Sequence, residues 1–185
     1  VLDADITGPS MPRFFGINEK RARMVPVDEN TIKFEPVETE SGIKVMSMNL
    51  VTKVEDEPLI WRGPVITGVL QQLYTDTLWG DLDYLLIDMP PGTSDVTLTT
   101  FQSIPLDGII VVTSPQDLVS LIVEKAINMA NAMNINILGL VENMSYVECP
   151  NCKEKIFLYG EGTTNKLASS LGIELLAKLP INPLN

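Results

Sequence analysis

The sequence predicts an α/β fold with a mostly parallel sheet and helices on both of its faces. Three short apolar runs, residues 83–88, 108–113 and 135–141, predict strands. Each run is followed by a segment whose pattern is helical, and strands that alternate with helices are typical of parallel sheets. Because 185 residues suffice for one buried core, we expect a single domain over residues 1–185.

The first half of the chain predicts a strand, a hairpin and a helix. Residues 1–5 read as the end of a buried strand. Residues 32–35 and 43–48 alternate with a period of about two around a turn at 40–42, which predicts that these two segments form a hairpin. Gly63 opens a helix with Pro64 in its first turn. The apolar face expected for this helix consists of Val65, Val69 and Leu73.

The second half predicts three helices and the remaining strands. Residues 93–103 and 163–171 are expected to be helical, and residues 175–179 to form the last strand. Residues 114–117 resemble a capping box with Pro115 at the first helical position. The helix that starts there is expected to bury Leu118, Leu121, Ile122, Met129 and Met133.

Composition restricts the function. The formal net charge is −11, from 24 acidic and 13 basic residues, which argues against a nucleic-acid partner. No apolar run approaches the roughly 18 residues of a membrane span, and no signal peptide opens the chain. The absence of histidine excludes histidine as base or ligand, and two cysteines are too few for a secreted disulfide framework. We therefore expect a cytoplasmic protein without a membrane partner, and we expect this chain to be a piece of a longer protein, trimmed at both ends.

Polar residues gather where the predicted parallel strands end, which is where such sheets bind ligands. Asp88 ends one strand and suits a Mg²⁺-bound water, and Gly92 brings a backbone N–H within reach of a phosphate. Asp88 could instead cap the next helix. Asp3 and Asp5 point the same way if the chain is extended, which suits metal-bound water, or else one of them stabilises a turn. Asn143 could read a purine edge or hold a turn.

Cys149 and Cys152 are the only two cysteines, and they lie in a polar turn at residues 146–153. Two thiolates supply half of the ligands of a tetrahedral zinc ion or a four-iron cluster. Either a second subunit completes the set, or the site is transient, or the pair is redox-active, or the cysteines have no function. The Gly-rich loop with Lys-Ser/Thr that cradles phosphates in P-loop proteins does not occur in this sequence.

Five motifs in this order resemble the Mrp/ApbC family of iron–sulfur cluster carrier ATPases, relatives of MinD and the nitrogenase iron protein. The motifs are Leu2–Ser10, Trp61–Pro64, Leu86–Asp95, Val141–Ser145 and Cys149–Cys152. The resemblance covers residues 1 to about 180. It implies a deviant-Walker P-loop NTPase fold whose N-terminal P-loop unit, about 30 residues, precedes Val1 and is absent from this chain.

The same resemblance implies roles for the candidate residues. Asp3 and Asp5 correspond to the first switch, Asp88 to Gly92 to the Walker B strand and second switch, and Asn143 to an adenine contact. Cys149 and Cys152 of two subunits are implied to hold one [4Fe–4S] cluster, with the metal segment at about residues 144–160. Lys153 departs from the family, since relatives often have glycine there.

Two functions follow as hypotheses. The first is a slow, homodimeric, Mg²⁺-dependent ATPase that assembles a [4Fe–4S] cluster and transfers it to apo-proteins, with ATP binding expected of the intact protein rather than of this chain without its P-loop. The second is a MinD-like ATPase that positions partners and has a structural zinc at the cysteine pair. Metal content distinguishes them, except that zinc could also replace a cluster.

Overall fold

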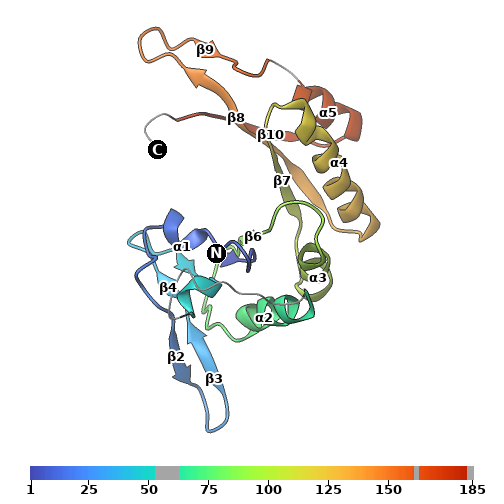
Figure 1. Cartoon of the computed structure of the whole chain (residues 1–185). Helices are drawn as coiled ribbons and strands as arrows, with labels where there is room; N and C mark the ends of the chain where they lie inside the picture. The colour runs from blue at the N-terminus through green and yellow to red at the C-terminus, as the bar shows by residue number, and fades with distance from the viewer. Residues whose placement is uncertain (53–62, 161–162, 183–185) are drawn as a thin grey trace. The chain divides into compact units, whose positions relative to one another are not determined.

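The computed structural model describes residues 1–52, 63–160 and 163–182, which form two compact units, Val1–Ile104 and Pro105–Asn185 (Figure 1). Trp61 and Arg62, which belong to one of the family motifs, lie outside the described residues.

A short parallel pair lies at the centre of the first unit. Strand β1 (Leu2–Asp3) pairs with β6 (Ile87–Asp88), so that Leu2 faces Ile87 and Asp3 faces Asp88. Met46 lies on the other side of β1, where its carbonyl accepts the N–H of Asp3 at 2.9 Å. Strand β1 is therefore covered on both edges, as expected for the end of a buried strand.

Strand β6 is shorter than predicted, and the prediction that residues 83–88 are buried is wrong. Tyr84 is 85% exposed and Leu86 is 63% exposed. Within the described residues β6 has one strand neighbour, β1, so its apolar run lacks the second neighbour and the two covered faces that such runs usually have.

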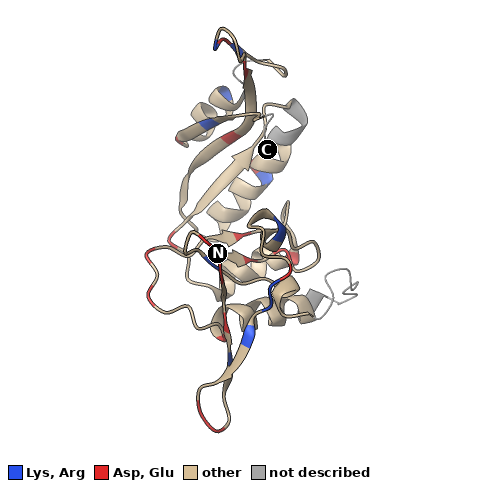
Figure 2. Cartoon of the chain, turned by 90° about the vertical axis from the view of Figure 1, so that its left-hand side faces the viewer, with Lys and Arg blue, Asp and Glu red and all other residues tan. Residues whose placement is uncertain are grey.

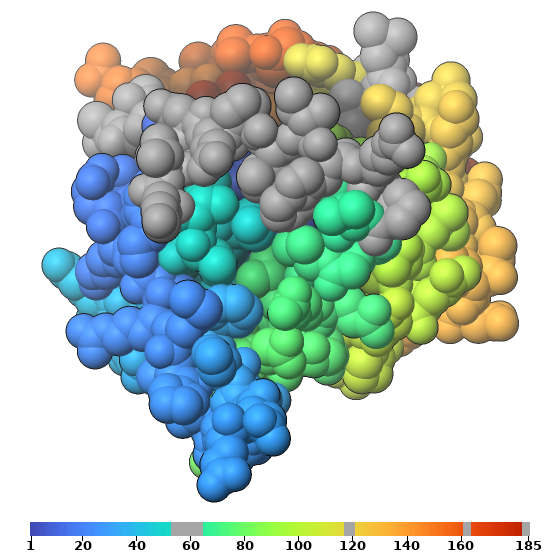
Figure 3. Space-filling view, turned by 60° about the horizontal axis from the view of Figure 1, so that its bottom comes forward, coloured from blue at the N-terminus to red at the C-terminus, as the bar shows by residue number. Residues whose placement is uncertain are grey.

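Two hairpins occupy residues 23–45, and the predicted pairing of 32–35 with 43–48 is wrong. Strand β3 (Ile32–Glu35) pairs with the preceding β2 (Arg23–Pro26), and this hairpin projects from the unit (Figures 1 and 3). The predicted turn instead joins β4 (Val37–Glu38) to β5 (Lys44–Val45). Pro36 explains the separation of β3 from β4, because proline has no N–H to donate to a strand ladder.

The first unit also contains α1 (Met11–Phe14), a 3₁₀ turn (Met48–Leu50), α2 (Gly63–Thr75) and α3 (Asp95–Ser103). Helix α2 begins at Gly63 as predicted. Its buried residues are Ile66, Leu70 and Leu73. Of the predicted face, Leu73 is therefore confirmed, whereas Val69 is half-buried and Val65 is 50% exposed. A second small core contains Ile17, Val37, Val45 and Leu50.

The second unit is a parallel sheet in the order β10-β8-β7, formed by β7 (Ile109–Thr113), β8 (Ile137–Glu148) and β10 (Leu175–Pro180). Helices α4 (Asp117–Ala132) and α5 (Thr163–Leu171) contribute to one core with the sheet, made of Val111, Val123, Ile127, Leu140 and Ala168. The alternate residues of β7, Ile110 and Val112, are 50% and 60% exposed. Both helices of this unit therefore cover the same face of the sheet, which corrects the expectation of helices on both faces for this part of the chain.

Helix α4 differs from the prediction at its start and in its buried face. It begins at Asp117 with Gln116 as N-cap and no capping side-chain bond, so the predicted capping box is wrong. Leu121 and Ile122 are more than half exposed, whereas Val123, Ile127 and Ala130 are buried. The side chain of Leu118 lies outside what the structure describes. Helix α5 matches the predicted bounds, and β10 extends one residue beyond them.

Strand β8 is much longer than the predicted 135–141, and its far end pairs antiparallel with β9 (Lys155–Ile156). Of the six strand pairings among the described residues, three are parallel and three antiparallel, so the fold is mixed α/β. No helix in the described part of the chain is both long and apolar enough to cross a bilayer.

Candidate functional site

The acidic end of β1 and β6 brings Asp3 and Asp88 together. Asp3 is fully buried, and its Oδ2 accepts the N–H of Met11 at 3.2 Å and the hydroxyl of Ser47 at 2.9 Å. Its Oδ1 is buried and has no recorded hydrogen bond to any of the described residues. Because register partners on parallel strands lie about 4.8 Å apart, the Asp88 carboxyl emerges beside that of Asp3.

Asp5 and Gly92 lie in the loops that follow these strands. Asp5 is half-buried, and its Oδ1 accepts the Thr7 hydroxyl and the Gly8 N–H, both at 3.0 Å. The turn interpretation of Asp5 is therefore confirmed, and its Oδ2 accepts neither of these bonds. Gly92 has a φ of 81°, a left-handed conformation, and is exposed just before α3.

Burial and mutual repulsion disfavour the charged form of the carboxyl groups at this acidic end. Burial raises the pKa of Asp3 to about 6, and the charge of Asp88 adds to the rise, against the hydrogen bonds from Ser47 and Met11. Burial, with the charge of Asp5, likewise raises the pKa of Asp88. A cation bound here would offset the repulsion among these carboxylates.

The acidic end fits Mg²⁺ held through water better than a directly ligated metal. No group of three or more acidic or cysteine side chains among the described residues is arranged to hold a metal ion. Mg²⁺ usually keeps several waters and takes one or two carboxylates together with substrate phosphates. The orphaned Oδ1 of Asp3 and the raised pKa of Asp88 are compatible with such a site.

Asn143 lies in the second unit, inside β8 rather than after it. Its side chain is exposed, and its Oδ1 accepts the N–H of Met144 at 2.9 Å. The amide therefore stabilises the local backbone, as one of the two interpretations predicted. The NH₂ group of the same amide is free of any bond that the structure records among the described residues.

The cysteine pair occupies the turn that joins β8 to β9. The N–H of Cys149 binds the carbonyl of Glu154, and the N–H of Lys153 binds the carbonyl of Cys149, both at 2.9 Å. Both thiols are free, and Cys152 is exposed. Backbone N–H groups of Cys152 and Asn151, followed by the Cys152 thiol, lower the pKa of Cys149 because they donate to its sulfur.

This turn fits a thiolate-bound metal or cluster that is reached from solvent. Amides directed at a sulfur favour the thiolate, which is the form that binds soft metals. The sequence contains two cysteines and no histidine, so one copy of this chain offers two such ligands. Basic residues occur in both units (Figure 2), and Lys20, Arg21, Arg23 and Lys44 line one pocket of the first unit.

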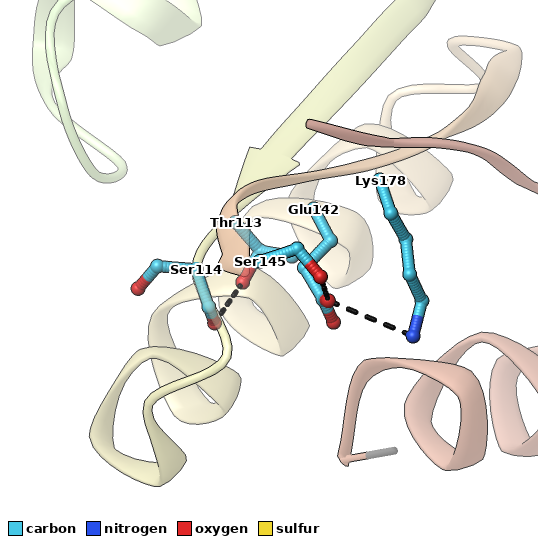
Figure 4. Close-up of polar contacts among 5 residues, drawn as sticks. All are labelled: Thr113, Ser114, Glu142, Ser145 and Lys178. Atoms are coloured by element: carbon cyan, nitrogen blue, oxygen red, sulfur yellow. Dashed lines mark hydrogen bonds and ion pairs between the residues drawn. The ribbon is translucent and has the colours of Figure 1, made fainter. Parts of the chain in front are cut away.

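A buried polar network in the second unit was missed by the sequence predictions. Glu142, 2% exposed, accepts a hydrogen bond from Ser145 and pairs with Lys178 at 3.6 Å (Figure 4). Burial acts to raise the pKa of Glu142, but Ser145, Thr164 and Lys178 together hold it below its usual value. An acid at the end of an apolar strand was the signal that could have revealed this network. Ser47, the partner of Asp3, gave no such signal.

Comparisons with known proteins identify the family of this chain. Residues 1–184 match the family described as ParA, NUBPL iron-transfer P-loop NTPase. An iron-sulfur cluster carrier protein of Clostridium perfringens is 57% identical over 184 residues, which are 98% of this chain and 64% of that protein. The protein of the same name from Methanocaldococcus jannaschii is 43% identical over 183 residues, 98% of this chain and 61% of that protein. The chain thus spans less than two thirds of the length of these relatives.

Two solved structures share the fold. A nucleotide-binding protein from Archaeoglobus fulgidus, in complex with ADP and with cobalt, has a TM-score of 0.79 and 41% identity over 98% of this chain and 68% of its own. MinD from Pyrococcus horikoshii with Mg-ADP has a TM-score of 0.56 and 19% identity over 99% of this chain and 68% of its own, which shows the fold alone. The resemblance to iron–sulfur cluster carriers and the P-loop NTPase-like fold are confirmed, and the chain belongs to the family of NUBPL-type iron-transfer P-loop NTPases.

Proposed function

We propose that the intact protein is an ATP-hydrolysing carrier that assembles a [4Fe–4S] cluster and transfers it to apo-proteins in the cytoplasm. The observation that carries this proposal is the Cys149–Cys152 turn, whose free thiols lie at the exposed end of a hairpin in a member of this family. Free thiols suit a reducing compartment. The cluster is the cargo, and acceptor proteins that lack their own cluster are the partners.

A homodimer completes the ligand set. A [4Fe–4S] cluster takes four thiolates, and each copy of this chain offers Cys149 and Cys152. Two copies would therefore supply four. The exposed position of Cys152 supports this arrangement, since a cluster shared between copies must be reached from outside each chain.

The acidic end of the first unit is the proposed nucleotide–Mg²⁺ site. Asp88 and Asp5 would hold Mg²⁺ through its waters, and the buried Asp3 would fix the geometry of the loop and accept from such a water through Oδ1. The ion would neutralise phosphate charge. Gly92 would donate its N–H to a terminal phosphate, and Asn143 would contact the adenine. The phosphate-binding loop would come from the part of the relatives that this sequence does not match.

The test is anaerobic reconstitution of the full-length protein with iron and sulfide, with and without Cys149→Ala. We expect about four irons per dimer with absorbance near 400 nm, and loss of both in the variant. Ser170→Ala, an exposed change in α5, is the control and should keep the iron. No iron in the wild type, with stoichiometric zinc after zinc exposure, would favour a MinD-like ATPase with a structural zinc and would overturn the carrier proposal.

A further inference from the structure

Glu142 lies in the middle of a polar row that crosses the second unit's sheet. In the register of the strands it is flanked by Thr113 of β7 and Lys178 of β10. Thr113 is buried as well, and Lys178 is about one quarter exposed (Figure 4). Thr164, in the first turn of α5, also binds the Glu142 carboxyl. A charged residue is thus enclosed by three elements at the end of the sheet's apolar core.

Strand β8 bulges immediately after Glu142. Lys178 is paired with Glu142, but Pro180, two residues later, is paired with Tyr146, four residues later. Strand β8 therefore has two residues more than β10 over this stretch. Met144 has a φ of 54°, a left-handed conformation that is costly for a side chain with a Cβ. The Ser145 hydroxyl reaches back across this bulge to Glu142 Oε1, so the side-chain bond closes it.

The network combines favourable contacts with an incomplete set of partners. Ser145, Thr164 and Lys178 hold the pKa of Glu142 below its usual value, so together they outweigh the effect of burial. Within the described residues, Glu142 Oε2 has no recorded hydrogen bond, and the ion pair with Lys178 is long at 3.6 Å. Removing one partner of such a buried charge leaves that charge uncompensated. Bulges that re-aim side chains are common next to functional sites, and strain of this kind persists only where the surroundings impose it.

The bulge begins at one candidate functional residue and precedes the other. Asn143, its first residue, presents an exposed amide, and Cys149 lies six residues later, just beyond the end of β8, about 20 Å along an extended strand. Beyond the bulge, β8 is held again because the N–H of Ile181 binds the Tyr146 carbonyl at 2.7 Å. Residues 143–145, between these anchors, have no register partner on β7 or β10 among the described residues.

We propose that the clasp formed by Glu142, Ser145 and Lys178 is a positioning device that sets the bulge of β8 and so couples nucleotide contact at Asn143 to the Cys149–Cys152 turn. This proposal rests on the proposed function, which assigns the nucleotide contact to Asn143 and the cluster ligands to Cys149 and Cys152. The clasp touches neither nucleotide nor cargo, so its residues act through Asn143 and through the hairpin. A nucleotide bound to the Asn143 amide changes the backbone conformation of the bulge. The clasp determines whether this change is transmitted to the hairpin that holds the cysteines.

The test uses the full-length protein without metal and follows hydrogen–deuterium exchange of the amides of residues 146–156, with and without Mg-ADP. Ser145→Ala opens the clasp, and Lys178→Met removes its cation, with Lys178→Arg as the conservative partner. Ser170→Ala removes a similar hydroxyl bond outside the clasp and is the matched control. Nucleotide affinity is measured for each variant by calorimetry.

We expect Mg-ADP to change exchange in the hairpin of the wild type, Ser170→Ala and Lys178→Arg by at least about fivefold, the low end of ordinary coupling between sites. In Ser145→Ala and Lys178→Met this change should vanish, with nucleotide affinity within about threefold of the wild type, since allosteric coupling and binding are separate quantities. An unchanged response in both clasp variants would overturn the proposal, as would a wild-type hairpin that ignores nucleotide.

Iron content separates this proposal from the proposed function. Because the exchange experiment needs no metal, it remains readable if the wild type takes up no iron, which would overturn the carrier function alone. In reconstituted protein, Ser145→Ala should hold the same iron per dimer as the wild type. Loss of iron in Ser145→Ala together with an intact nucleotide response would mean that the clasp supports only the cysteine turn, and would overturn the coupling.

Discussion

The acidic end of β1 and β6 and the cysteine turn of β8 and β9 are built in opposite ways. Asp3 is fully buried and bound by Ser47 and Met11, whereas Cys152 is exposed and its turn is closed by backbone bonds. The first region keeps its shape through packing, and the second through a short hairpin. A buried, pre-organised site such as the acidic end suits a ligand that must be held in one orientation. An exposed pair of thiolates such as the cysteine turn suits a metal or cluster that is to be transferred.

The same contrast appears in the ionisable groups. Burial raises the pKa of Asp3, so the acidic end is strained until a cation or a proton arrives. Backbone N–H groups lower the pKa of Cys149, so the turn favours the thiolate without a partner. The acidic end therefore contains a carboxylate that is unfavourable in the absence of a cation, whereas the thiolate of the cysteine turn costs the fold little.

The largest expected effect separates the two regions by stability. Leu2→Ala removes a fully buried side chain from β1 and should lower the free energy of unfolding of the first unit by about 2–5 kcal/mol. Cys152→Ser, in the exposed turn, should change it by less than about 0.5 kcal/mol. Urea unfolding followed by circular dichroism measures both. Comparable losses in the two variants would contradict the view that the turn is energetically independent of a core.

The second prediction concerns pH. Since the pKa of Asp3 rises from 3.8 to about 6 on folding, the folded state binds this proton more tightly than the unfolded state does. The resulting stability is fully present below pH 3.8 and is lost as pH rises through 6. Asp3→Asn removes this loss and should stabilise the metal-free protein by at most about 3 kcal/mol at pH 8, with the gain vanishing near pH 4.

Thermal unfolding between pH 4 and pH 8 tests this dependence. Asp28→Asn is a control with the opposite sign, because hydrogen bonds from Asn30 and Thr31 lower the pKa of Asp28. This replacement should therefore destabilise the protein at pH values above the usual pKa of an aspartate. A gain for Asp3→Asn that stayed constant across the pH range would show that the carboxyl is not the source of the strain. Saturating Mg-nucleotide should shrink the gain, since the cation stabilises the carboxylate.

The sequence could predict the strand ends more reliably than the pairing between strands. Asp3 and Asp88 were predicted at the ends of parallel strands, and the two strands do end there and run parallel, although the pairing of β1 with β6 was not itself predicted and β6 begins only at Ile87. The strand predicted to pair with Ile32–Glu35 was wrong, because Pro36 interrupts the hydrogen bonding between strands at this point. Periodicity alone does not reveal such an interruption. The buried faces of α2 and α4 were predicted only in part, because each helix has apolar residues on more than one side: Leu73 is buried, whereas Val65 and Leu121 are exposed.

The candidate site was predictable where it depends on residue type and not where it depends on contacts. Cys149 and Cys152 could be identified from spacing alone, and the structure adds the N–H groups that favour the thiolate. Glu142, an acid at the end of an apolar run, could have been identified from the sequence, but its partners Ser145, Thr164 and Lys178 could not, because they come from three elements. The length of β8 was missed since its polar second half lacks the apolar alternation of a predicted strand.

The smallest expected effect compares left-handed residues in the two regions. Lys153 follows Cys152 with a φ of 62°, and Gly92 follows β6 with a φ of 81°. Lys153→Gly should relieve about 1 kcal/mol of backbone strain. It also loses an exposed ion pair with Glu148 at 3.2 Å, worth between about 0 and 1 kcal/mol, so the net gain is at most about 1 kcal/mol.

Gly92→Ala should cost about 1–2 kcal/mol, since nothing crowds the site and the backbone alone is strained. Urea unfolding of both variants measures the two changes. Equal and opposite shifts would mean that both turns carry the same strain, whereas a loss in Lys153→Gly would show that the ion pair holds the cysteine turn more firmly than its exposure implies.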